Sequence, residues 1–124
     1  MTKQRLGDPM PVPLSPGWRA GDFVFTSGQV PTDDSGKLVG DTIEEQTRAV
    51  LKRIEGILAK AGCGLADVVK TTVWLQDRSE FQRFNATYKE FFPNDPPARS
   101  TVEAKLMIDA KIEIEAIAYK PQGK

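Results

Sequence analysis

The hydrophobic residues of this chain follow a helical period in two stretches. From Asp41 to Ala61 they recur at intervals of three and four residues, which predicts an amphipathic helix. Asp41 is the expected N-cap, and Glu44, three residues on, completes the capping pattern. A second helix is expected to begin at Asp77, and it carries an aromatic stripe that we expect in the core: Phe81, Phe84, Tyr88 and Phe91.

Elsewhere, apolar and polar residues alternate, which is the period of a β-strand. This pattern covers 22–27, 68–75 and two strands near the C-terminus, and turn residues predict a hairpin between 22–27 and 37–39. The proline-rich stretch 1–17 indicates an extended arm or a short edge strand. The order of elements predicts an α+β two-layer sandwich, in which a mixed sheet of about six strands carries two helices on one face.

Side-chain parity predicts which residues share a face of this sheet. We expect Val69 to point the same way as Val73, and Val102 and Ala104 to lie over the helices. If the last two strands pair as a hairpin, Thr101 lies roughly across from the carboxylates of the last strand. The face away from the helices is then either wet or docked against another subunit, and it carries Thr72, Trp74, Arg99, Thr101, Glu103, Glu113 and Glu115.

Arg99 is the strongest candidate for a functional residue in these strands. Two prolines precede it, at the start of its strand, and the expected parity places Glu113 on the same face. A fixed guanidinium beside a carboxylate is suited to holding a small anion and to proton chemistry next to it. The alternatives are structural: Arg99 pairs with Glu103, Glu113 is a solvated strand position, and Gly28 only ends a strand.

Composition narrows the kinds of chemistry that are available. The chain has 124 residues, which we expect to form one domain over 1–124. Lys plus Arg and Asp plus Glu each number 17, so no charge excess favours a nucleic-acid partner. There is no histidine and one cysteine, which argues against a metal site or a disulfide and predicts a reducing, cytoplasmic location. No apolar run is long enough for a membrane helix.

Several stretches resemble the Rid family, the reactive intermediate deaminases, also called RidA, YjgF or L-PSP. They are FTSGQVP at 25–31, EEQTRAVL at 44–51, ADVVKTTVWLQD at 66–77 and FNATYKEFF at 84–92, followed by PARSTVEA and KIEIEAIA near the end. The resemblance implies a chorismate-mutase-like fold and a homotrimer with clefts between subunits. It also implies hydrolysis of 2-imino acids to 2-keto acids and ammonia, with no cofactor and no metal.

The resemblance also assigns site residues. Arg99 matches the arginine that pairs with the substrate carboxylate, and Glu113 matches the glutamate that positions or activates water. Thr101 stands where cysteine is common, at a position whose backbone contacts substrate and water.

Four further residues belong to the implied cleft. Ser27 and Gly28 match a loop whose backbone contacts the substrate, and Asn85 matches an asparagine at the cleft border. The chain departs from the family at Leu14, which stands where many active members carry a tyrosine. Trp18 is near in sequence and is expected to narrow the cleft instead.

Three functions follow as hypotheses. The first is an imine deaminase of the 2-iminobutanoate and 2-iminopropanoate type. The second is a trimer that binds 2-keto acids without turnover, which the loss of the cleft hydroxyl at Leu14 keeps open. The third is an endoribonuclease or translation inhibitor, against which the zero net charge and the lack of histidine weigh.

Overall fold

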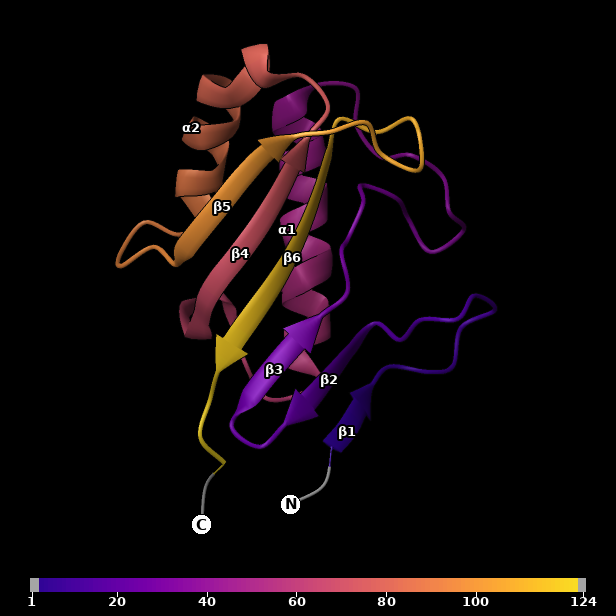
Figure 1. The fold of residues 1–124 in the computed structure, drawn as a ribbon, viewed down its shortest axis with the longest axis vertical. Helices are drawn as coiled ribbons and strands as arrows, with labels where there is room; N and C mark the ends of the chain where they lie inside the picture. The colour runs from indigo at the N-terminus through magenta and orange to yellow at the C-terminus, as the bar shows by residue number, and fades with distance from the viewer. Residues whose placement is uncertain (1–2, 123–124) are drawn as a thin grey trace.

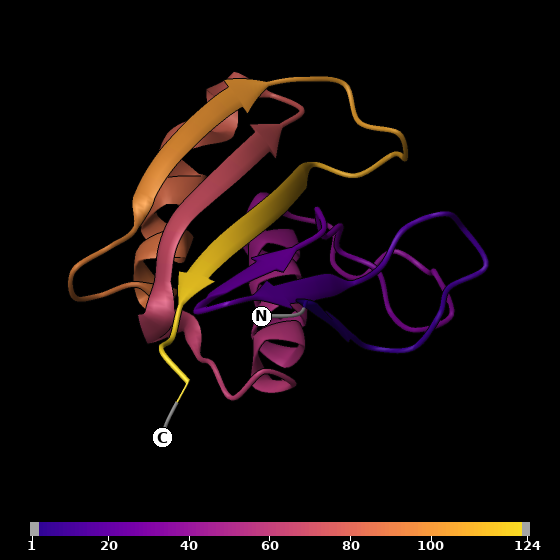
Figure 2. The ribbon, with the colours of Figure 1, turned by 60° about the horizontal axis from the view of Figure 1, so that its bottom comes forward.

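The computed structural model describes residues 3–122, which form one six-stranded mixed sheet with two helices packed on one face (Figures 1 and 2). The strand order is β1-β2-β3-β6-β4-β5, and only the β4–β5 pair is parallel among these neighbours. The predicted fold class is therefore confirmed. The elements are β1 (Lys3–Leu6), β2 (Gly17–Ala20), β3 (Phe23–Thr26), α1 (Ile43–Ala59), β4 (Val68–Leu75), α2 (Phe81–Phe91), β5 (Ala98–Glu103) and β6 (Ile112–Tyr119), with 3-10 turns at Leu65–Asp67 and Arg78–Glu80.

The N-cap of the first helix lies one residue later than predicted. Thr42, not Asp41, is the N-cap, and its hydroxyl accepts a hydrogen bond from the Glu45 amide at 3.1 Å. The Glu45 carboxylate accepts in return from the amides of Asp41 and Thr42. The threonine–glutamate pair prevails over the predicted pair of Asp41 and Glu44 because it satisfies amides on both sides of the helix start.

The front of the sheet differs from the predicted hairpin. β3 pairs with β2, a strand that the sequence analysis did not predict. The edge strand expected within residues 1–17 is confirmed as β1, which pairs with β2 at the end of the sheet. Residues 37–39 contribute only an isolated bridge between Thr32 and Leu38. Their hairpin prediction was wrong because both edges of β3 are already taken, by β2 and by β6.

The last two strands do not form a hairpin, and this reverses the predicted side of β5. β5 pairs only with β4, in parallel, and places Arg99 beside Thr71 and Thr101 beside Val73. Since Thr71 and Val73 are buried under the helices, Arg99 and Thr101 face the helices too. Glu103 shares this side, whereas Val102 is 48% exposed on the opposite face. The predicted pairing of Thr101 with Glu113 or Glu115 is wrong for the same reason.

Two smaller parity predictions also change. A β-bulge between Val68 and Lys70 buries Val68 in the core and leaves Val69 exposed. In the aromatic stripe of α2, Phe84 and Tyr88 are buried as predicted, but Phe81 is 38% exposed and Phe91 is only partly buried. Phe92, one residue past the helix, enters the core.

The face of the sheet away from the helices, here called the open face, is unusually apolar. Four large side chains on it are each more than 40% exposed: Phe23, Phe25, Val102 and Tyr119. Contiguous exposed apolar surface of this kind is typical of a protein–protein contact. Within residues 3–122, no helix has the length and apolar character needed to cross a bilayer.

Candidate functional site

The structure divides the predicted site residues between two places. Arg99 and Asn85 line one hollow where β5 packs against α2, and Thr101, two residues further along β5 on the same face, lines a second hollow. We call these three residues the arginine side. Glu113 and Gly28 meet at the open face, next to a hollow lined by Leu14, and we call this group the glutamate side. The sheet separates the two groups, so Arg99 and Glu113 are not on one face as predicted.

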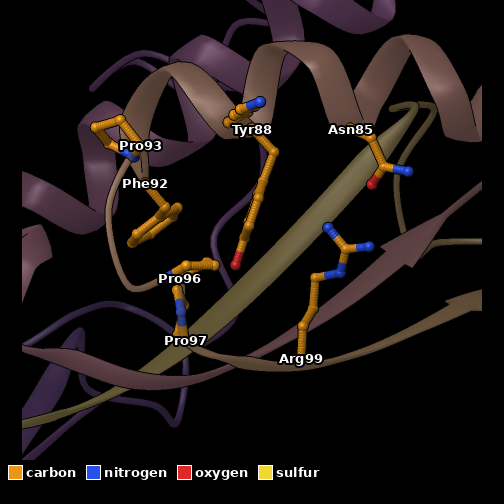
Figure 3. Close-up of a pocket in the computed structure, with 8 residues that line it drawn as sticks. Asn85, Tyr88, Phe92, Pro93, Pro96, Pro97 and Arg99 are labelled. Atoms are coloured by element: carbon orange, nitrogen blue, oxygen red, sulfur yellow. The ribbon is translucent and has the colours of Figure 1, made fainter.

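On the arginine side, the Arg99 guanidinium lies between β5 and α2 (Figure 3). Its Cζ is 5.6, 5.2 and 5.0 Å from the ring centres of Phe81, Phe84 and Tyr88. Within residues 3–122 it forms no salt bridge, and Glu103, its predicted structural partner, instead accepts a hydrogen bond from the Arg78 amide. The N–H donors of Arg99 therefore stay available for a ligand.

Arg99 borders a hollow of about 560 Å³ that has cationic and apolar walls. Asn85 and Tyr88 enter it from α2, and Figure 3 shows the Asn85 amide oxygen pointing toward the guanidinium. Lys89 adds a second cation, while the residues lining the hollow include no acid; the remaining lining residues are Phe92, Pro93, Pro96 and Pro97. Pro96 and Pro97 stand directly before β5, in which Arg99 is the second residue, and the whole arrangement suits an anion.

Two polar atoms beside Arg99 are buried without a protein partner. They are Asn85 Oδ1 and Thr101 Oγ1, and neither has a hydrogen bond within the described residues. An unpaired buried polar atom is unfavourable by about 1–3 kcal/mol. Such atoms are rare in folded proteins and often mark a place where a ligand, a water or a partner completes the site.

On the glutamate side, an isolated bridge brings the strand-ending loop onto β6. The Gln29 amide donates to the Ile114 carbonyl at 2.7 Å, and the Ile114 amide donates back at 3.1 Å. This places Gly28 against the Glu113 carboxylate so closely that a Cβ on residue 28 would overlap Glu113 Oε2. Gly28 thus permits the observed position of the Glu113 carboxylate, which a side chain at residue 28 would displace.

The Glu113 carboxyl is partly buried, and its surroundings favour the protonated form. Burial raises the pKa of Glu113 above its ordinary value, and the nearby Glu115 carboxylate raises it further. Trp74 lies across from Glu113 in the β4–β6 ladder. A carboxyl with a raised pKa exchanges protons at a higher pH than an ordinary glutamate does.

The three remaining predicted residues occupy different surroundings. The Ser27 hydroxyl donates to the Ser15 carbonyl, so this side chain ties the loops together. Leu14 is 50% exposed and lines a hollow of about 600 Å³ together with Gly28. Trp18 lies on the open face across from Phe25, with the Lys3 ammonium 4.5 Å from its ring centre.

Sequence reasoning missed two features of these groups. The rings of Phe84 and Tyr88 were read as core only, although their spacing on α2 also makes them a surface for Arg99. Arg53 of α1 reaches the Gly28 loop, where it donates to the Thr32 carbonyl at 2.8 Å and to Gln29 Oε1 at 3.2 Å. No local pattern signals that contact, because it joins residues more than 20 positions apart. Within residues 3–122, no cluster of three or more acidic or cysteine side chains is arranged to hold a metal.

Two relatives of this chain are named differently: the name of one gives only a family, and the name of the other gives an enzyme activity. The chain is 45% identical over 115 residues to a "RutC family protein" of Pyrococcus abyssi, covering 90% of this chain and 91% of that protein. It is 40% identical over 127 residues to the 2-iminobutanoate/2-iminopropanoate deaminase of Salmonella typhimurium, covering 97% and 99% of the two chains.

Solved structures agree with the fold. A putative endoribonuclease of Thermotoga maritima superposes with a TM-score of 0.91 at 39% identity, covering 98% of this chain and 100% of that one. Escherichia coli TdcF, solved with bound serine, superposes with a TM-score of 0.87 at 33% identity, covering 94% and 98%. The family model "Endoribonuclease L-PSP" matches residues 8–120. The chain therefore belongs to the L-PSP family, the family that its motifs resemble.

Proposed function

We propose that this protein hydrolyses small 2-imino acids to 2-keto acids and ammonia. The observation that carries the proposal is the Arg99 guanidinium, which has no acidic partner within residues 3–122 and borders a hollow without acidic side chains. Arginine binds a carboxylate through two parallel N–H donors, which fixes orientation as well as position. A relative named as a deaminase of this kind, 40% identical, supports the same substrate class.

The reaction needs positioning more than strong catalytic groups. Water adds to the carbon of the protonated imine, the C–N bond then breaks, and nitrogen leaves as ammonia while the keto group remains. Arg99 holds the carboxylate next to that carbon. The Glu113 carboxylate orients the water and accepts its proton as the C–O bond forms. It then returns that proton to the nitrogen, so that ammonia leaves as the C–N bond breaks, and Gly28 lets the carboxylate lie against the loop backbone.

The same proposal requires more than one copy of the chain. Arg99 faces the helices at the β5 edge, while Glu113 lies on the open face two strands away. One small substrate contacts both only if they come from different copies. We therefore propose that the sites lie between subunits, in the homotrimer that the family resemblance implies, and the exposed apolar side chains of the open face support an assembly. The single cysteine supports a cytoplasmic location.

The assembly is testable by sedimentation. Phe25 is 41% exposed in the middle of the open face, so Phe25→Asp should leave the fold intact and shift a trimer toward monomer. Wild type that sediments as a monomer at micromolar concentration contradicts the assembly.

The function is testable by replacing Arg99. A dehydratase that releases the enamine precursor supplies the imine, and keto-acid formation is followed with time. Arg99→Ala should abolish turnover. Arg99→Lys should reduce it strongly, because lysine keeps the charge but lacks the two parallel N–H donors of arginine, here called the fork. Full activity in Arg99→Ala overturns the proposal.

A second candidate, binding without turnover, is favoured by Leu14. That position carries no hydroxyl, and the TdcF structure shows a family member holding serine. Wild type that binds 2-oxobutanoate in calorimetry but does not accelerate imine hydrolysis would select this candidate.

A further inference from the structure

Three aromatic rings on α2 lie in a row beneath Arg99, and we call Phe81, Phe84 and Tyr88 the aromatic shelf. Neighbouring ring centres are 6.4 Å apart for Phe81 and Phe84 and 5.2 Å apart for Phe84 and Tyr88. The guanidinium carbon lies within 5.6 Å of all three ring centres and is nearest to Tyr88.

The shelf attracts the cation without using its hydrogen-bond donors. Aromatic faces are negative, so a guanidinium over them is held electrostatically. The N–H groups lie in the plane of the guanidinium, and within residues 3–122 none of them is paired in a salt bridge. An acidic partner would hold Arg99 as firmly, but it would compete with the ligand for the fork.

Tyr88 is itself fixed from the sheet. Its hydroxyl hydrogen-bonds the Thr71 hydroxyl at 2.7 Å, and Thr71 is the residue of β4 that pairs with Arg99 in the ladder. Tyr88 is 5% exposed and also packs on Phe92, with ring centres 4.8 Å apart. The ring thus has little freedom to move away from the cation.

We propose that Tyr88, assisted by Phe84 and Phe81, is a positioning residue that orients the Arg99 fork toward the carboxylate of the ligand. This inference rests on the proposed function for the identity of the ligand. It predicts that removing the Tyr88 ring weakens binding of carboxylates specifically, since the shelf acts only through Arg99.

The test measures binding by calorimetry, with 2-oxobutanoate and its uncharged amide as probes. Tyr88→Leu should bind 2-oxobutanoate about 10-fold more weakly and leave the affinity for the amide unchanged. Tyr88→Phe keeps the ring and should remain within about twofold of wild type. In turnover assays the loss in Tyr88→Leu should appear in KM more than in kcat.

Phe91→Leu is the matched control. Phe91 lies on α2 and packs against the hydrophobic core, so the substitution removes a comparable ring that neither lines the hollow nor contacts the cation. It should keep the wild-type affinity for 2-oxobutanoate. The proposal is overturned if Phe91→Leu loses as much as Tyr88→Leu, if Tyr88→Leu keeps full affinity, or if it loses keto acid and amide equally.

Phe81→Leu keeps the proposal testable if Tyr88→Leu does not fold. Phe81 is 38% exposed, so its replacement should not disturb the core, and its ring is the farthest from Cζ of the three. We expect about a two- to threefold loss for 2-oxobutanoate alone. No loss in Phe81→Leu, when Tyr88→Leu cannot be made, counts against the shelf.

The shelf and the proposed function fail in different ways. Wild type that binds 2-oxobutanoate through the shelf but hydrolyses no imine refutes the enzyme and leaves the positioning role standing. Wild type that turns over imines while Tyr88→Leu shows an unchanged KM refutes the shelf alone. Wild type that does not bind 2-oxobutanoate refutes the shelf as stated.

Discussion

The arginine side and the glutamate side hold their functional groups by opposite means. Arg99 sits over aromatic rings and has no ionic partner within the described residues, so its charge stays available. Glu113 is partly buried and lies near Glu115, so its charged form is disfavoured and its pKa is raised. An available cation can fix a carboxylate, whereas a carboxyl with a raised pKa can exchange a proton. In the proposed reaction, the sheet of each chain thus separates the group that would hold the carboxylate from the group that would exchange the proton.

The largest expected effect tests whether the two sides come from different copies. Arg99→Ala and Glu113→Gln should each be inactive alone. If every site takes Arg99 from one chain and Glu113 from its neighbour, an equal mixture refolded together regains intact sites in about a quarter of the clefts. Steady-state imine hydrolysis of the refolded mixture checks this.

The control for that experiment is the unmixed sum of the two inactive proteins, refolded separately. An inactive mixture that sediments like wild type shows that both groups act from one chain, and it would remove the physical basis of the proposed cleft.

A second prediction disturbs the glutamate side alone. Gly28→Ala forces the Glu113 carboxylate to move, since the new Cβ overlaps it. Misplacing a reacting group by about an ångström lowers turnover on the order of 100-fold, so kcat should fall by that much. The affinity for 2-oxobutanoate should change little, because Arg99 is untouched.

Gly56→Ala is the matched control for Gly28→Ala. Gly56 borders the Leu14 hollow from α1 and has open space where its Cβ would stand. It should keep wild-type kcat. Equal losses in both variants indicate a general disturbance of the loop and not a displaced carboxylate.

The raised pKa of Glu113 predicts a dependence on pH. The folded state binds the Glu113 proton more tightly than the unfolded chain does, so this group favours folding at low pH, and that contribution is lost as pH rises through the folded pKa. The Tm of wild type relative to Glu113→Gln should therefore fall as pH rises above the ordinary glutamate pKa of 4.5, and turnover should rise over the same range as the carboxylate forms.

Glu115→Gln sharpens the pH prediction. Because the Glu115 carboxylate contributes to the raised pKa of Glu113, removing it should move the acid limb of the rate profile to lower pH. If the acid limb of the rate profile has the same midpoint pH in wild type, Glu113→Gln and Glu115→Gln, the titrating group belongs to the substrate instead.

The smallest expected effect comes from Leu14→Tyr, which adds a hydroxyl next to Gly28. A neutral hydrogen bond contributes about 0.5–1.5 kcal/mol, so KM should fall by roughly two- to tenfold. Leu14 is 50% exposed, and the melting temperature should stay the same. An unchanged KM means that the hydroxyl is not needed for the substrate measured.

Local patterns in the sequence predicted much of the architecture. The helical periods placed α1 and α2, although α2 begins at Phe81 and Asp77 caps only the 3-10 turn before it, and alternation placed β4 over 68–75. These predictions succeeded because each depends on residues that are close neighbours in the chain. The resemblance added Gly28 and Asn85 to the candidate residues. In the structure Gly28 lies against Glu113, and Asn85 lines the same hollow as Arg99.

Only the tertiary structure decided which strands are neighbours. A hairpin between the last two strands satisfies the same alternation as the observed order, yet α2 returns the chain so that β5 runs parallel to β4 at the edge. That single choice turns Arg99 toward Tyr88 and away from Glu113. Strand pairing is decided by contacts between distant residues, which alternation within one strand does not encode. The side on which each charged group lies is therefore a property of the assembled sheet.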